Sequence, residues 1–335
     1  MILHENKTLF RQSIQFTADQ LQIPAIYVEK DYWVTFALFT IFNDEIGKDT
    51  VFKGGTALSK CFNMIERFSE DIDLVVLRHE GETNNQLTNK IKKISSVVTT
   101  VMPETNIANV TQKMGMNRKT AHSYAKEFTG AYGQVRDVVI VEATWLGYFE
   151  PYTTKLLSSY VGEMMINNGQ KAMAESNGLM PFEVRVLVVT RTLCEKIMSL
   201  VRFSYSAEPM DDLKSKIRHM YDLHQLLSQT EFAEFFNAPT FEEMLMRVAQ
   251  DDVASFKNNN AWLQHHPVEA LVFRNVEEVW KALAPVYSGQ FRNLVYGILP
   301  IESEIFATLV VIKNRLSAMN WKIELTPTVN EIHRG

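Results

Sequence analysis

Two neighbouring stretches of sequence decide the fold: VFKGGTALSK at residues 51–60 and ERFSEDIDLVVL at residues 66–77. In the first, a short β-prone segment meets a Gly-Gly pair, and helical spacing then runs from Thr56 to Ile65. In the second, the apolar run from Ile72 to Leu77 predicts a strand. The expected order is therefore strand, Gly-Gly-Thr, helix, strand.

The same stretches carry groups suited to polyphosphate chemistry. Glycines between a strand and a helix let the backbone approach a phosphate closely, and the helix start offers free amides. Asp71 and Asp73 are two residues apart on a predicted strand, so they project from the same face. Paired carboxylates beside a polyphosphate suit Mg²⁺, and two such ions can hold the attacking and leaving oxygens of a displacement at phosphorus.

A third carboxylate is expected at Glu142, inside the apolar strand predicted from Val138 to Thr144. Burying a charge there is costly unless a cation compensates it, which favours a metal ligand. The alternative is a solvated strand face, because Thr144 lies on the same side by alternation.

Each motif has a simpler interpretation when it is taken alone. A Gly-Gly pair before a helix is usually only a turn, and an Asp-x-Asp triplet is more often a solvated strand edge. Glycosyltransferases use the same triplet for sugar nucleotides, but the Gly-Gly-Thr turn ahead of the carboxylates argues against them. The combination is what favours nucleotide chemistry.

The whole chain is typical of a globular protein. Its 335 residues predict roughly two domains, and 46% hydrophobic and 22% charged residues exclude a disordered or fibrous protein. A net charge of −5 disfavours a protein that coats nucleic acid through bulk charge, although a local basic face could bind RNA. Cys61 and Cys194 make neither a disulfide framework nor a metal motif. The sequence shows no signal-peptide pattern and no apolar stretch long enough to span a membrane, so we expect a cytoplasmic protein.

Strands dominate the first half and helices the second, which predicts an α+β domain over residues 1–180 followed by a helical domain over residues 181–335. A capping box is expected at Thr192 and Glu195, at the start of one of these helices. Further elements are expected as helices at 12–21, 24–42, 85–102, 193–202, 213–227, 241–248, 268–283 and 302–319, and as a strand at 182–189.

These motifs resemble the AbiEii/AbiGii abortive-infection toxin family of nucleotidyltransferases, within the DNA polymerase β-type superfamily. The likeness rests on the Gly-Gly-Thr-Ala-Leu-Ser-Lys and Ser-Glu-Asp-Ile-Asp-Leu strings, and it continues in EKDYWV at 29–34, TLCEKIMSL at 192–200 and RHMYDL at 218–223. The resemblance implies a nucleotidyltransferase-type mixed sheet with flanking helices, followed by a C-terminal helical domain.

The resemblance also implies a role for each matching residue. It places the nucleotide at Gly54, Gly55, Thr56 and Ser69, and the metals at Asp71, Asp73 and Glu142. It assigns Lys196 to the triphosphate and makes Asp222 a further catalytic acid, both supplied to the cleft by the helical domain. From the residues alone, Lys196 could instead pair with Glu195 or Asp222, and Asp222 could bridge to Arg218.

The implied reaction is transfer of a nucleoside monophosphate from an NTP to an acceptor, with two Mg²⁺ ions. The resemblance implies the toxin of a toxin–antitoxin or abortive-infection system with a cognate antitoxin protein, and tRNA as an acceptor of some relatives. Rival hypotheses are a transferase that modifies proteins with AMP and a non-catalytic nucleotide-binding partner protein. Basic clusters that could contact RNA are Lys90, Lys92 and Lys93, then Arg118 and Lys119, then Lys214, Lys216 and Arg218.

Overall fold

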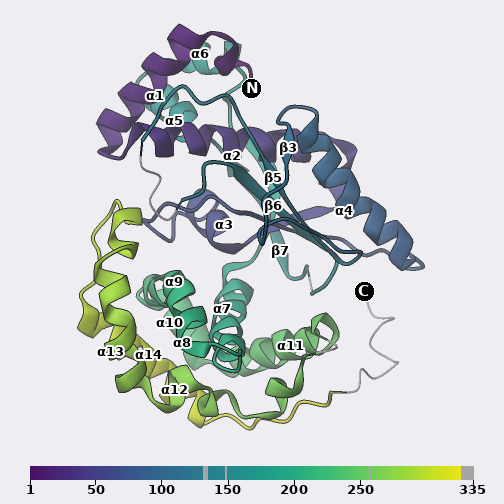
Figure 1. Ribbon diagram of the computed structural model, residues 1–335, viewed down its shortest axis with the longest axis vertical. Helices are drawn as coiled ribbons and strands as arrows, with labels where there is room; N and C mark the ends of the chain where they lie inside the picture. The colour runs from purple at the N-terminus through teal and green to yellow at the C-terminus, as the bar shows by residue number, and fades with distance from the viewer. Residues whose placement is uncertain (131–134, 148, 257–258, 326–335) are drawn as a thin grey trace. The chain divides into compact units, whose positions relative to one another are not determined.

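The computed structural model describes residues 1–130, 135–147, 149–256 and 259–325, which form two compact units (Figure 1). Unit 1 comprises Met1–Asn63, Phe68–Trp145 and Tyr152–Leu187, and unit 2 comprises Met64–Arg67, Leu146–Pro151 and Val188–Gly335. Among the described residues, no helix is both long enough and apolar enough to cross a membrane.

Unit 1 is built on one mixed sheet of eight described strands, in the order β3-β5-β6-β2-β1-β8-β7, with β4 paired to β5. The strands are β1 (Thr50–Lys53), β2 (Ile72–Val76), β3 (Glu104–Thr105), β4 (Gln112–Lys113), β5 (Asn117–His122), β6 (Val139–Thr144), β7 (Tyr152–Leu157) and β8 (Phe182–Leu187). β2 runs antiparallel to β1 and parallel to β6, and β5 runs antiparallel to β6. The mixed sheet and the α+β class predicted from the sequence are confirmed.

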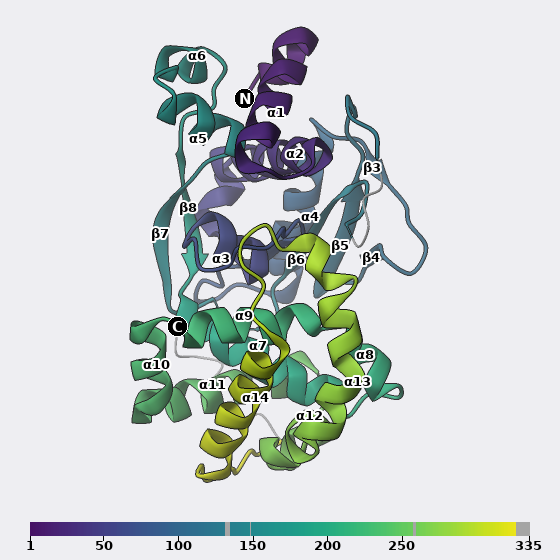
Figure 2. The same ribbon diagram turned by 90° about the vertical axis from the view of Figure 1, so that its left-hand side faces the viewer.

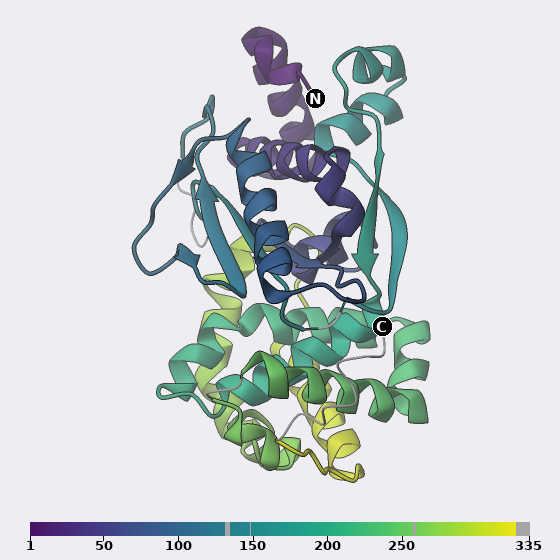
Figure 3. The ribbon, with the colours of Figure 1, turned by 90° about the vertical axis from the view of Figure 1, so that its right-hand side faces the viewer.

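The helices of unit 1 cover one face of this sheet and its edge. They are α1 (Lys7–Leu21), α2 (Ala25–Asn43), α3 (Gly54–Lys60), α4 (Asn84–Thr99), α5 (Tyr160–Asn167) and α6 (Lys171–Ser176). The blue helix α4 lies across the sheet in Figure 3, and the Arg118 guanidinium of β5 donates to the Ser95 hydroxyl of α4 at 2.5 Å. Neighbouring side chains of a strand point to opposite faces, so Lys119, which follows Arg118 on β5, points to the face opposite α4.

Unit 2 is helical, and its helices pack amphipathic faces around a common core. They are α7 (Val189–Phe203), α8 (Pro209–Ser215), α9 (Ile217–Leu227), α10 (Thr230–Asn237), α11 (Pro239–Ser255), α12 (Leu271–Arg274), α13 (Val276–Ser288) and α14 (Glu302–Ser317). Short 3₁₀ helices lie at Leu3–Glu5, Glu45–Asp49, Ala261–Gln264, Pro267–Glu269 and Phe291–Leu294. Figure 2 shows α13 and α14 side by side, and Leu283 and Leu309 are buried between elements of this unit.

The structure corrects several expected boundaries. Helix α7 begins at Val189, so the predicted capping box is wrong: Thr192 lies inside the helix, where its hydroxyl donates to the Val188 carbonyl at 3.3 Å. The helix predicted at 213–227 is interrupted at Lys216.

Three further differences concern unit 1 and its border. Helix α3 ends at Lys60 and does not continue to Ile65 as predicted. Strand β7 and helices α5 and α6 form where no element was predicted. Because β8 pairs with β1 and β7, the division between the units falls after Leu187 and not after residue 180.

Candidate functional site

Four charged side chains lie in a row across the centre of the unit 1 sheet. Lys53 on β1 is directly opposite Asp73 on β2, and Asp73 is opposite Glu142 on β6. Glu142 is in turn opposite Lys119 on β5. Residues in register share a face of the sheet, so two adjacent carboxylates are flanked by a lysine on each side. This face is the one opposite α4.

The Gly-Gly turn brings the backbone against Asp73. Gly54 has φ +80°, and a Cβ added to it would lie 2.2 Å from Asp73 Oδ2. Both the positive φ and the close contact require glycine. Sequence reasoning expected the backbone to approach a phosphate at this turn; the structure shows that it approaches the carboxylate of Asp73.

We expect Gly54→Ala to reduce both stability and the nucleotide transfer that the resemblance implies, whereas Gly81→Ala is expected to affect stability alone. Gly81 has the same φ of +80° but meets nothing within 4 Å, so its variant carries only the backbone strain of about 1–2 kcal/mol. The Gly54 variant must also displace the Asp73 carboxylate. Transfer rates and melting temperatures of the two variants measure the difference, and equal transfer rates would contradict this role for Gly54.

Thr56 fixes the segment that leads into β2. Its side chain is buried, and its hydroxyl donates to the Asp71 carbonyl at 2.6 Å and lies 3.0 Å from the Ser69 hydroxyl. The structure thus brings together Thr56, Ser69 and Asp71, which sequence reasoning predicted to be in one site. Their contact holds the start of α3 against the residues preceding β2.

Buried Lys30 on α2 bonds to both of the segments that lead into β2 and β6. Its ammonium pairs with Glu70 at 2.7 Å and donates to the carbonyl oxygens of Arg136 and Val138. Glu70 also accepts the Arg136 amide at 2.9 Å. The sequence analysis assigned no role to Lys30 or Glu70; for Lys30, the EKD string on an apolar helix was the available signal.

The two central carboxylates differ in how their charge is compensated. Burial, reinforced by Glu142 and Asp71, raises the pKa of Asp73 to about 7. Burial also opposes the charge of Glu142, but Lys119 at 2.9 Å and the Asn117 amide at 3.1 Å outweigh it and lower the pKa of Glu142. Asp73 is therefore the carboxylate that would gain most from an added cation.

Asp71 completes the acidic group. Its Oδ1 is buried and accepts no hydrogen bond within the described part of the chain, and the nearest cation is Arg136 Nη1 at 3.6 Å. The described residues hold no preformed cage of three or more His, Cys, Asp or Glu ligands. Glu142 instead pairs with Lys119. Asp71 and Asp73 still fit Mg²⁺, which needs only one or two carboxylates when phosphate oxygens supply the rest.

Unit 2 contains the other two predicted residues, and they contact each other. Lys196 Nζ lies 2.6 Å from Asp222 Oδ2, and the Arg67 guanidinium donates twice to Asp222 at 2.7 Å. All three side chains are buried. Lys196 therefore pairs with Asp222 and not with Glu195, and the structure pairs Asp222 with Arg67 in place of the suggested Arg218.

Comparison with known proteins decides the family. The family model described as "Nucleotidyl transferase AbiEii toxin, Type IV TA system" matches residues 37–302. The chain belongs to this family. It is thus a nucleotidyltransferase, of the kind that serves as the toxin of a type IV toxin–antitoxin system, and the resemblance read from the sequence is confirmed.

One solved structure similar to this AbiEii-family chain is MenT4, a nucleotidyltransferase toxin from Mycobacterium tuberculosis H37Rv. It is 17% identical, with a TM-score of 0.42, and the alignment covers 89% of this chain and 98% of that one. The comparison with curated proteins gives no match.

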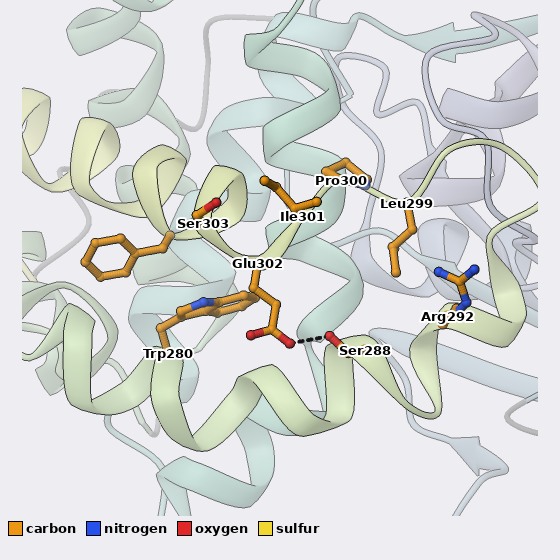
Figure 4. Close-up of a pocket in the computed structure, with 9 residues that line it drawn as sticks. Trp280, Ser288, Arg292, Leu299, Pro300, Ile301, Glu302 and Ser303 are labelled. Atoms are coloured by element: carbon orange, nitrogen blue, oxygen red, sulfur yellow. Dashed lines mark hydrogen bonds between the residues drawn. The ribbon is translucent and has the colours of Figure 1, made fainter.

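One surface pocket lies in unit 2 and is not the predicted site. It has a volume of about 700 Å³, and the Ser288 hydroxyl bonds to Glu302 at its edge (Figure 4). None of the described residues that line it was predicted to be functional. They are Trp280, Ser288, Arg292, Leu299, Pro300, Ile301, Glu302, Ser303 and Phe306.

Another pocket adjoins the carboxylate row of this AbiEii-family chain. It has a volume of about 190 Å³ and opens beside Glu142. Its lining is polar except for one valine: Asn109, Val110, Gln112, Asn117, Lys119, Arg136 and Glu142. Of these, only Glu142 was predicted as a site residue, although Lys119 belongs to a basic cluster noted in the sequence.

The other basic clusters are largely occupied by ion pairs. Lys90 pairs with Asp49 and Glu82, and Lys93 pairs with Asp44. Such surface pairs are typical of solvated helix faces. Lys119 differs because its partner, Glu142, is itself a predicted site residue.

Proposed function

We propose that this AbiEii-family enzyme transfers a nucleoside monophosphate from an NTP to a hydroxyl of an RNA acceptor, with tRNA as the first candidate. The acceptor oxygen bonds to the α-phosphorus, the bond from that phosphorus to the bridging oxygen breaks, and pyrophosphate leaves. The observation that carries the proposal is the pair Asp73 and Glu142 in register on β2 and β6, with Asp71 beside them. Adjacent carboxylates at one point of a sheet suit phosphoryl-type transfer, where positioning and charge neutralisation supply most of the catalysis.

Asp71 and Asp73 are the proposed ligands of Mg²⁺, with Glu142 as the third. When bound, Mg²⁺ would neutralise phosphate charge and orient the α-phosphate. The chain's own contribution is to hold the acidic group rigidly, through Thr56 on one side and the Lys30–Glu70 pair on the other. A carboxylate of this group would also accept the proton of the attacking hydroxyl.

The NTP is proposed to lie on the α3 side of the row, against Gly54, Gly55, Thr56 and Ser69. Lys196 and Asp222, in the helical domain, are proposed to complete the site by contacting the triphosphate and by orienting that contact. Support for this comes from the family match, which spans both units, and from the Lys196–Asp222 pair. We also propose that the protein acts in the cytoplasm, as a phage-defence toxin paired with its cognate antitoxin.

Lys196→Ala is expected to weaken NTP binding more than folding. Loss of a charged hydrogen bond costs about 1.5–3 kcal/mol, which raises the dissociation constant roughly ten- to a hundredfold. Asp222 keeps its two bonds to Arg67 in this variant, which limits the loss of stability.

Titration of NTP in the presence of Mg²⁺ measures the effect of this variant. Lys214→Ala, on the exposed surface of α8, is the matched control and should bind NTP normally. An unchanged dissociation constant for the Lys196 variant would mean that this lysine serves only the structure of unit 2.

The acceptor class is tested by incubating the purified protein with each NTP, labelled at the α-phosphate, together with RNA and protein from the host. Mass spectrometry of both fractions should find RNA carrying an added nucleotide. Label on protein alone would support an AMP-type protein modifier instead. No covalent product, together with measurable NTP binding, would support a non-catalytic nucleotide-binding protein.

A further inference from the structure

The pocket beside Glu142 continues the charged row on the same face of the sheet. Gln112 on β4 is opposite Lys119 on β5, and Lys119 is opposite Glu142 on β6. The segment that carries Asn109 and Val110 forms another wall of this pocket. The pocket thus begins where the carboxylates end.

The in-line geometry of the displacement indicates which substrate occupies the pocket beside Glu142. In an in-line displacement, the attacking and leaving oxygens are on opposite sides of the phosphorus. The proposed triphosphate position is at α3, next to β1, so the leaving group departs on that side of Asp73. With strands about 4.8 Å apart, β5 lies about 14 Å from β1, on the side from which the acceptor must come.

The chemistry of the pocket fits a nucleotide. Three carboxamides, from Asn109, Gln112 and Asn117, offer both donors and acceptors to a base edge. Asn117 donates to Glu142 at 3.1 Å, while its Oδ1 is buried and accepts no hydrogen bond within the described ranges. That oxygen can therefore accept an N–H from a base.

Two cationic side chains of the same pocket can bind the phosphate of a nucleotide. The side chains of Lys119 and Arg136 are 28% and 43% exposed, so both remain accessible to a phosphate. Cations beside base-reading amides are expected in a site for a nucleotide, whereas a serine or tyrosine side chain of a protein carries no phosphate for the cations to bind.

We propose that this pocket binds the terminal nucleotide of a single-stranded RNA acceptor and discriminates among bases through Asn117 and Gln112. Lys119 and Arg136 contact its phosphate. This inference rests on the proposed function, because it assigns the acceptor side of the same reaction.

The test measures RNA binding separately from catalysis. Fluorescence anisotropy, without NTP or Mg²⁺, compares four labelled single-stranded RNA oligonucleotides that differ only in the 3′-terminal base. We expect wild-type protein to discriminate between the best and worst by about tenfold. Gln112→Ala should weaken the best oligonucleotide by about tenfold and reduce the discrimination, with NTP affinity within about twofold of wild type.

Two further variants make the result specific. Asn109→Gly removes a second carboxamide while tolerating the φ of 61° at this position, and it should weaken RNA binding in the same way. Gln12→Ala, exposed on α1, is the matched control and should bind RNA normally. Melting temperatures exclude unfolding as the cause of any loss.

The outcomes separate this inference from the proposed function. The assignment of this pocket to the acceptor would be overturned if both pocket variants kept their RNA affinity. It would also be overturned if they lost NTP affinity in place of RNA affinity. Neither result would contradict nucleotide transfer itself. Labelling of protein with no RNA binding would also overturn the assignment. Base-dependent RNA binding that both pocket variants weaken would support the pocket even if transfer to RNA were not detected.

Discussion

Asp71→Asn is expected to abolish nucleotide transfer, with a loss of at least about a hundredfold, while the protein stays folded. The substitution keeps the shape of the side chain and removes the charge that is proposed to attract Mg²⁺. Its Oδ1 makes no hydrogen bond within the described residues, so little structure depends on the carboxylate. Transfer of labelled nucleotide by the purified variant measures the effect.

The matched control for this variant is Asp19→Asn, on the exposed surface of α1. It removes an equal charge from unit 1 and should transfer nucleotide at the wild-type rate. Near wild-type transfer by the Asp71 variant would remove Asp71 from the metal site.

Asp222→Asn is expected to destabilise unit 2 by about 3–5 kcal/mol, because it leaves two buried cations without their shared counter-ion. Arg67 and Lys196 both bond to this carboxylate, and all three side chains are buried. Calorimetry or urea unfolding measures the loss. Asp211→Asn, exposed on α8, should cost less than about 1 kcal/mol, and a similar small cost for Asp222→Asn would contradict the structural role.

The pH dependence of stability provides a second signature of this cluster. Burial alone would raise the pKa of Asp222, but Arg67 and Lys196 outweigh it and hold the pKa well below its ordinary value of 3.8. The contribution of Asp222 to stability is therefore complete above the unfolded-state pKa and is lost as the pH falls below it. The Asn variant should lack this part of the acid destabilisation.

The local part of the candidate site could be predicted from the sequence because its signals are local. Gly54, Thr56 and Asp71 lie within one short stretch, and the spacing of Asp71 and Asp73 predicted that they share a face; in the structure Asp71 directly precedes β2. The structure adds that Gly54 is required by Asp73 itself, a contact that no pattern of residue types reveals.

Partners far apart in the chain could not be predicted. From the residues alone, a bridge from Asp222 to Arg218 on its own helix was the alternative to a catalytic role, but Asp222 bonds to Arg67, 155 residues away. The Lys119–Glu142 pair likewise depends on the register of β5 with β6. Because register and helix packing depend on the whole fold, residue spacing alone could not identify either pair.

The capping box failed for a related reason. Thr192 and Glu195 have the required spacing, but α7 starts three residues earlier, directly after β8. Glu195 instead bonds to Arg191 at 3.2 Å. The helix begins at buried Val189, and its N-cap residue Val188 makes no side-chain hydrogen bond.

The fate of the two ends of the NTP tests most directly whether the enzyme transfers a nucleoside monophosphate. NTP labelled at the α-phosphate or at the γ-phosphate is incubated with wild-type protein, Mg²⁺ and small RNA. We expect α-label to enter the acceptor, while γ-label is released in pyrophosphate. Acceptor that carries the γ-label would show phosphate transfer instead and would contradict transfer of a nucleoside monophosphate.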